Sequence, residues 1–265
     1  IYNGDIVAMA SSPAYDPNAF VHGIDRKTWG KLLKHRDKPL INKAIAGLYP
    51  PGSTIKTLVA LSSLENDVIS PNLTVQCKGY IEFYGEKFHC WEKKGHGFMR
   101  MKDAIKRSCD IYFYEVARRL GVDRLSETAK KFGLGKKVLE GFKEERSGVV
   151  PNTKWKKKYI GKNWYLGETL HSGIGQGYFQ STPMQLCLMM SQLANGGHEI
   201  KPRLVDDKEA LTKVIDGWRS EFFSRNNNLD FPNPNLKKLY KNRENIKFVL
   251  DALYGATNEP MGTSY

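Results

Sequence analysis

Long apolar runs are missing from this sequence, because no stretch reaches the roughly 18 apolar residues that a membrane-spanning helix needs. Internal repeats, low-complexity tracts and a recognisable nucleic-acid-binding motif are also missing, so we expect no nucleic-acid partner. Global disorder is excluded by the 40% of residues that are hydrophobic, which is enough for a packed core. The 265 residues are therefore expected to form one sizeable domain with insertions or two small domains.

An initiator methionine and a signal peptide are missing as well. The chain begins at Ile1, and the Asn3-Gly4 pair between short apolar runs predicts a hairpin at residues 1–12. A hairpin with only two residues before its turn suggests a fragment of a longer protein. On that expectation, the missing targeting signals carry no information about localisation.

Acidic residues are few compared with basic ones, and the net charge is +13. The run Lys154-Trp155-Lys156-Lys157-Lys158 suggests attraction to something anionic. Nucleic acid, an anionic membrane face or an acidic polymer would each fit such a charge. A soluble, lysine-rich surface without a specific partner is the simpler interpretation, and we favour it.

Hydrophobic spacing and turn residues predict a mixture of helices and short strands. The helix after Thr182 has a clear start, with Thr182 as its N-cap and Pro183 at its first position, and Cys187 within it is expected in the core. The predicted segments are a short helix or irregular stretch at 24–35, helices at 53–66, 101–120, 123–135 and 181–197, strands at 72–100, loops at 15–20 and 141–170, and a polar region at 201–250 that resists assignment.

The first candidate for chemistry is the pair Ser53 and Lys56, at the start of a helix that follows Pro-Pro-Gly. Positions three apart share one helix face, so the hydroxyl and the ammonium are expected to meet. A serine needs a neighbouring base to become a nucleophile, and burial or positive potential can lower the pKa of a lysine enough to serve. The alternative is that Ser53 is an ordinary N-cap, but a capping box would place Glu or Gln at position 56. S-x-x-K alone is a weak pattern.

A second candidate follows about fifty residues later, where Ser108 and Asp110 stand in "RSCDIYFYEVA". Penicillin-recognising enzymes combine S-x-x-K with S-D-N and K-T-G. The second of these motifs supplies a hydroxyl that can relay a proton and a polar side chain that holds the lysine. The alternative is a buried serine and an ordinary cap, and we favour the functional interpretation because Ser53 and Lys56 accompany them.

With these residues the sequence resembles the transpeptidase domain of class B penicillin-binding proteins, in the elongation-type branch called penicillin-binding protein 2. The resemblance runs in order along most of the chain. The matching segments are "GDIVAMASSPAYDPN", "LYPPGSTIK", "SCDIYFYEVA", "RLGVDRLSETAKKFGLG", "EERSG", "GIGQGYFQSTPMQL" and "TNEPMGTSY". The resemblance implies a serine penicillin-recognising fold of the α/β (α+β) class, with a mostly antiparallel sheet flanked by helices and cut at both ends.

The resemblance also implies a function, namely peptidoglycan D,D-transpeptidation. Ser53 would be acylated by a D-Ala–D-Ala stem peptide or by a β-lactam, and the acyl group would pass to an amine of a neighbouring stem. Lys56 would be the general base, and Ser108 and Asp110 would complete the polar network. Substrate-binding residues would be Gly175, Gln176 and Gly177, in sequence order.

Further expectations come from the same resemblance. It implies a periplasmic domain of an inner-membrane-anchored protein, a glycosyltransferase and elongation-complex proteins as partners, and no organic cofactor. The family's third motif, K-[ST]-G, is absent from the chain, which stops at Tyr265 shortly before the motif is expected. We therefore expect residues 1–265 alone to show little or no transpeptidation.

Cysteine is scarce, with four residues in the chain, and three of them surround a histidine: Cys77, Cys90, His96 and Cys109. Three cysteines and one histidine form a standard structural zinc set, although this spacing is not a standard one. A disulfide or simple buried thiols are the alternatives. The resemblance favours zinc, because elongation-type relatives carry a zinc site at matching positions, and such a site would tether the second motif to an insert at residues 72–100.

Two other functions stay open at this point. A serine β-lactamase or penicillin sensor of the same fold would also use S-x-x-K, but the chain shows no clear motif for a deacylating glutamate. A non-catalytic, zinc-stapled binding module would explain the missing K-[ST]-G. The seven matching segments favour the transpeptidase.

Overall fold

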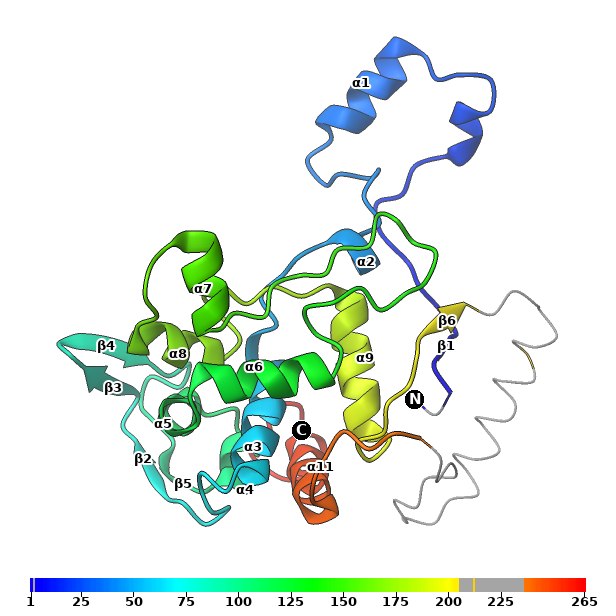
Figure 1. Cartoon of the computed structure of the whole chain (residues 1–265). Helices are drawn as coiled ribbons and strands as arrows, with labels where there is room; N and C mark the ends of the chain where they lie inside the picture. The colour runs from blue at the N-terminus through cyan, green and yellow to red at the C-terminus, as the bar shows by residue number, and fades with distance from the viewer. Residues whose placement is uncertain (2, 205–211, 213–235) are drawn as a thin grey trace.

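The computed structural model describes residues 1, 3–204, 212 and 236–265. Most of the polar region predicted at 201–250 lies outside these residues. The described chain consists of helices and short strands (Figure 1). The elements are β1 (Asp5–Ile6), η1 (Pro17–Phe20), α1 (Arg26–Lys34), α2 (Lys43–Ala46), η2 (Gly52–Ile55), α3 (Lys56–Glu65), β2 (Val75–Cys77), β3 (Tyr80–Phe83), β4 (Glu86–His89), β5 (Gly97–Met99), α4 (Met101–Lys106), α5 (Asp110–Leu120), α6 (Val122–Lys131), α7 (Thr153–Ile160), α8 (Leu166–Gly173), α9 (Pro183–Ala194), β6 (Arg203–Leu204) and α11 (Arg243–Asn258).

Helix α3 lies at the centre of the core. Every residue from Lys56 to Leu64 is buried, because α5, α6 and α11 pack around the helix. A helix without charged residues on any side is typical of a fully enclosed position, and the sequence "TLVALSSL" contains only apolar and small hydroxyl side chains. Packing on α3 therefore fixes the start of this helix, where Ser53 and Lys56 lie.

The strands of the described chain form three two-stranded sheets. β2 pairs with β5 and β3 pairs with β4, both antiparallel, so the strands predicted at 72–100 are confirmed. No helix among the described residues is both long and apolar enough to cross a bilayer.

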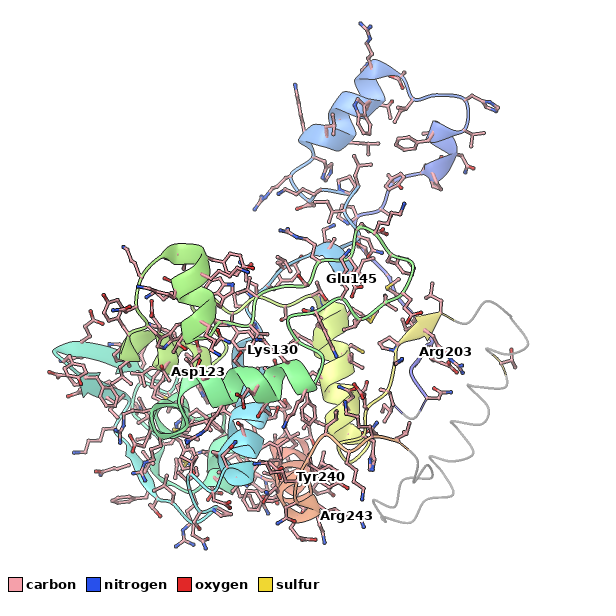
Figure 2. All side chains as sticks on the ribbon, viewed as in Figure 1. Asp123, Lys130, Glu145, Arg203, Tyr240 and Arg243 are labelled. Carbon is pink, nitrogen blue, oxygen red and sulfur yellow. The ribbon has the colours of Figure 1, made fainter. Side chains whose placement is uncertain are left out.

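The hairpin predicted at residues 1–12 is wrong. β1 pairs in parallel with β6, with Asp5 opposite Arg203, rather than with its own neighbours. Gly4 has φ +88° and lies so close to the Lys201 backbone that a Cβ would fall 1.9 Å from its carbonyl oxygen. An ion pair between Asp5 and Arg203 closes the same junction, and Figure 2 labels Arg203 on β6. The glycine thus serves a close approach between distant segments, and not a local turn.

Two further predictions need correction. The predicted loop at 141–170 contains α7 and α8, and their start signals are present in the sequence. The Asn152 side chain caps α7 by accepting from the Trp155 N–H at 2.7 Å, and Glu168 accepts from the Tyr165 N–H at 2.8 Å at the start of α8. Cys187 was expected in the core but is exposed on the outer face of α9.

The other predicted helices are confirmed, with one interruption. Thr182 caps α9, because its hydroxyl oxygen accepts from the Gln185 N–H. In turn, Gln185 Oε1 accepts from the Thr182 N–H at 3.0 Å. The stretch at 101–120 is not one helix but two, α4 and α5, which are separated at Arg107–Cys109. This break brings the second candidate motif to the site.

Candidate active site

Ser53 lies in the 3-10 turn η2, directly before α3, and its side chain is exposed. The turn is closed by Thr54, whose hydroxyl donates to the Pro51 carbonyl at 2.7 Å. The residue at the cap position is Pro51, and no side chain caps the turn. Ser53 is therefore not an N-cap, and its hydroxyl is available to a ligand.

Lys56 is one turn further along and has only 3% of its surface exposed. Its ammonium donates to the Ser108 carbonyl at 2.8 Å, the Ser108 hydroxyl at 3.0 Å and Asp110 Oδ1 at 2.7 Å. These bonds use all three of its donors. Within the described part of the chain, no hydrogen bond joins Ser53 Oγ to Lys56 Nζ, so the expected direct contact is not found, and Lys56 is bonded to Ser108 and Asp110 instead.

Ser108 lies at the break between α4 and α5, with φ +51°. A left-handed conformation is unfavourable for a residue with a Cβ. It is held by two backbone bonds, from the Ser108 N–H to the Ile105 carbonyl at 3.2 Å and from the Cys109 N–H to the Ala104 carbonyl at 2.9 Å. The turn aims both the carbonyl and the hydroxyl of Ser108 at Lys56, and Asp110 then begins α5.

Trp91 holds this motif from the opposite side, and the sequence did not single it out. Its backbone N–H donates to Asp110 Oδ2 at 2.9 Å, and its indole Nε1 donates to the Ser108 carbonyl at 3.0 Å. Asp110 therefore accepts from Lys56 with one oxygen and from Trp91 with the other. The only sequence signal for Trp91 is that it directly follows Cys90, a candidate metal ligand.

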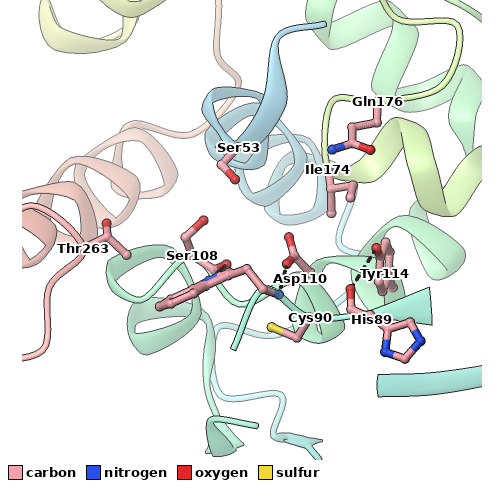
Figure 3. Close-up of a pocket in the computed structure, with 10 residues that line it drawn as sticks. Ser53, His89, Cys90, Ser108, Asp110, Tyr114, Ile174, Gln176 and Thr263 are labelled. Carbon is pink, nitrogen blue, oxygen red and sulfur yellow. Dashed lines mark hydrogen bonds between the residues drawn. The ribbon is translucent and has the colours of Figure 1, made fainter. Parts of the chain in front are cut away.

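A cleft of about 760 Å³ opens over these residues (Figure 3). Ser53 and Ser108 project into it from separate elements. Thr263 was not singled out from the sequence, and its N–H donates to the Lys106 carbonyl at 3.2 Å. The lining residues are Ser53, His89, Cys90, Trp91, Ser108, Asp110, Tyr114, Ile174, Gln176 and Thr263.

The three residues expected to bind substrate have different positions. Gln176 lines the cleft. Gly175 is buried with φ +72°, and a Cβ there would lie 2.2 Å from the Gly52 carbonyl oxygen. The Gly52 N–H donates to the Gly175 carbonyl at 3.0 Å, so Gly175 supports the turn that carries Ser53. Gly177 is exposed and is not among the lining residues.

The candidate metal ligands come together beside the second motif. All four are buried, and one donor atom from each lies within 4.8 Å of the others. His96 Nδ1 lies 3.5 Å from the sulfurs of Cys77 and Cys90, close to the separation of about 3.5–4 Å between ligands of a tetrahedral zinc. All the cysteines are free thiols, so the disulfide alternative is not what the structure contains. The hydrogen bond between Cys90 and Cys109 lowers the pKa of Cys90 and raises the pKa of Cys109.

The comparison with known proteins assigns the family. The model of the penicillin binding protein transpeptidase domain matches residues 2–265. The chain belongs to this family. It is 37% identical over its whole length to the peptidoglycan D,D-transpeptidase MrdA of Salmonella typhimurium and covers 41% of that protein; the MrdA of Escherichia coli strain K12 is 36% identical over 99% of the chain, which covers 40% of it.

Solved structures agree with this assignment. PBP2 of Pseudomonas aeruginosa, in complex with WCK 5153, superposes with a TM-score of 0.83 at 39% identity, over 98% of this chain and 54% of that one. PBP2 of Helicobacter pylori, in complex with MreC, gives 0.84 at 32% identity, over 100% of this chain and 45% of that one. The predicted fold class and family resemblance are thus confirmed, and the chain spans about two fifths of the length of the MrdA relatives.

Proposed function

We propose that this chain carries out the acyl-transfer chemistry of a peptidoglycan D,D-transpeptidase. The observation that supports it most directly is one cleft that contains an exposed serine, Ser53, beside the bonded group of Lys56, Ser108 and Asp110. Nucleophilic serines need this combination of an accessible hydroxyl, a base and a group that orients the base. Membership of the transpeptidase family supports the same function.

In the proposed mechanism, Ser53 Oγ attacks the carbonyl carbon between the two D-alanines of a stem peptide. Its proton passes through the Ser108 hydroxyl, which lies 3.0 Å from Lys56 Nζ, and reaches the leaving amine of the terminal D-alanine. The C–N bond breaks, and an ester joins the peptide to Ser53. An amine of a neighbouring stem then attacks the ester, and the proton returns to Ser53 by the same route.

The polar network has separate roles in this mechanism. Asp110 holds Lys56 and is itself held by Trp91. Lys56 would be the general base that draws the proton of Ser53 through the Ser108 hydroxyl, to which its Nζ is bonded. Gln176 borders the cleft and would bind the substrate amide. Gly175 would keep the turn that carries Ser53 in place. Gly177 is not among the residues that line the cleft.

Structural zinc is part of the proposal. Cys77, Cys90, His96 and Cys109 would supply four ligands, which leaves no open position for water and gives zinc no direct part in the reaction. The metal would stabilise the insert at residues 72–100. It would also fix Cys109, which stands between Ser108 and Asp110.

The proposed setting is the periplasmic part of an inner-membrane-anchored protein. Stem peptides and β-lactam antibiotics would bind in the cleft, and a glycosyltransferase and elongation-complex proteins would be its partners. The structure of H. pylori PBP2 with MreC supports a protein partner, and that of P. aeruginosa PBP2 with WCK 5153 supports the binding of a ligand.

The test uses the full-length protein with stem-peptide substrates. We expect it to release D-alanine and form cross-linked dimers, and the Ser53→Ala variant to do neither. Ser147→Ala, an exposed serine outside the cleft, should retain both activities. Rapid hydrolysis of a penicillin adduct would instead support a β-lactamase. Absence of both D-alanine release and cross-linking in the parent, as in the Ser53→Ala variant, would support a non-catalytic module.

A further inference from the structure

The basic run on α7 does not form a uniformly charged surface, because its central residue is buried. Lys156 has 2% of its surface exposed and forms an ion pair with Glu168. Its ammonium lies 4.6 Å from the ring centroid of Tyr165 and 5.9 Å from that of Tyr178. Lys156 is therefore a buried cation that packs against the surrounding aromatic rings through cation–π contacts.

These rings form a surface that we call the α7 aromatic surface, defined as Trp155, Tyr159, Tyr165 and Tyr178. Trp155 lies 6.0 Å from Tyr159 and 5.4 Å from Tyr178 between ring centroids. Tyr159 is 66% exposed and Tyr165 is 63% exposed. A cluster of rings that includes two well-exposed tyrosines indicates a binding surface more strongly than single exposed aromatics do.

The α7 aromatic surface rests on a fixed base. The Asp123 carboxylate, at the start of α6 (Figure 2), accepts from the Thr153 N–H at 3.0 Å and from its hydroxyl at 2.9 Å. Trp164 lies behind the surface and donates its indole N–H to the Thr169 hydroxyl at 2.7 Å. The rings are therefore positioned before any ligand arrives, which reduces the entropic cost of binding.

The α7 aromatic surface is joined to the rim of the cleft by a short stretch of chain. Tyr178 follows Gln176, a lining residue, by two positions in the segment that leaves α8. Lys154, Lys157 and Lys158 are exposed on the same helix. The exposed rings and the exposed ammonium groups therefore belong to the same part of the molecule.

We propose that the α7 aromatic surface binds the saccharide backbone of the glycan strand whose stem peptide occupies the cleft. Pyranose rings present apolar C–H faces that pack on aromatic faces, and carboxylates of the strand and its peptides would pair with the lysines of α7. This inference rests on the proposed function. Nucleic acid or an anionic membrane would meet the same lysines but would give no reason for Tyr178 to lie two residues from Gln176, which lines the peptide cleft.

The experiment measures binding of purified, peptide-free glycan strands to the full-length protein. The Tyr159→Ala/Tyr165→Ala double variant should bind about tenfold more weakly, which corresponds to about 1.4 kcal/mol. The matched control is Tyr254→Ala on α11, which removes an equally exposed ring, 65% accessible, outside the cleft; its affinity should be unchanged. Acylation of Ser53 by a fluorescent penicillin should be equal in all three proteins, because none of these residues lines the cleft.

Unchanged glycan binding by the double variant would overturn the inference. So would an equal loss of binding to duplex DNA or to vesicles of anionic phospholipid, because the surface would then recognise charge and not sugar. Failure of the penicillin to acylate Ser53 in the parent protein would count against the proposed function instead, whatever the glycan affinities are.

Discussion

Asp110 is the residue on which the polar network depends. Its two oxygens accept from different elements, Oδ1 from the Lys56 ammonium at the start of α3 and Oδ2 from the Trp91 backbone. The side chains of Lys56 and Asp110 are 3% and 12% exposed, so the pair is largely shielded from water. A buried ion pair is costly to break, because the remaining charge has no solvent to compensate it.

Replacing this carboxylate should therefore destabilise the protein. We expect Asp110→Ala to lower the free energy of unfolding by about 3 kcal/mol, because Lys56 keeps a buried charge without its anion. Asp110→Asn should cost less, because its carbonyl oxygen can still accept from Lys56. Urea denaturation measures both, with the exposed Asp103→Ala on α4 as the control. Equal stability of the Asp110→Ala variant and the parent would show that the pair contributes nothing.

At the level of residues, the sequence predicted the candidates but not their contacts. Helical spacing placed Ser53 and Lys56 on one face, and the structure shows Lys56 directed to Ser108 and Asp110. Trp91 could not be predicted, because its role depends on a contact between segments that are not adjacent in the sequence. Cys187 was predicted to be buried because its neighbours in the sequence are apolar, but it lies on the exposed face of α9.

Among elements, the break between α4 and α5 and the loop after α8 determine the shape of the site. Periodicity predicted one helix across 101–120, because both halves share an apolar face and no glycine or proline marks the break. Ser108 is found there in a left-handed conformation, which single-residue propensities do not favour. The sequence singled out Gly175 as a substrate-binding candidate, but it could not predict the contact between Gly175 and Gly52.

Gly175 and Gly161 offer a matched test of that contact. Their φ angles are +72° and +76°, so an alanine at either position meets similar backbone strain, about 1 kcal/mol. Only at position 175 would the new Cβ also collide with the Gly52 backbone, 2.2 Å away, whereas nothing lies within 4 Å at position 161. We expect Gly175→Ala to slow acylation of Ser53 by a penicillin and Gly161→Ala to leave the rate unchanged. Equal acylation rates in the two variants would show that the contact between Gly175 and Gly52 does not affect the reactivity of Ser53.

The insert at 72–100 is the second element-scale test. Protein purified without chelator should contain about one zinc per chain. Removing the metal should lower Tm and speed hydrogen exchange from β5 (Gly97–Met99) to the start of α5, because Cys109 loses its anchor. Cys77→Ser should lose the metal, and Cys187→Ser, at an exposed thiol outside the cluster, should retain it. Metal analysis that finds no zinc in the parent protein would contradict the site.

Across the whole molecule, the cleft is assembled from parts that lie far apart in the chain. Ser53 comes from η2, Ser108 from the α4–α5 break, Gln176 from the loop after α8 and Thr263 from the C-terminal segment. Short motifs could be predicted from the sequence because each has its own local pattern. Their convergence depends on packing around α3, and on long-range contacts such as β1 with β6, which local patterns do not specify.

The central claim is that Ser53 is a nucleophile that depends on Lys56. The most direct measurement is mass spectrometry of the full-length protein after brief exposure to a fluorescent penicillin. We predict a single covalent adduct on the peptide that contains Ser53, none in Ser53→Ala, and acylation slowed by about a hundredfold or more in Lys56→Ala. An adduct on a different residue, or undiminished labelling of the Ser53→Ala variant, would contradict the account.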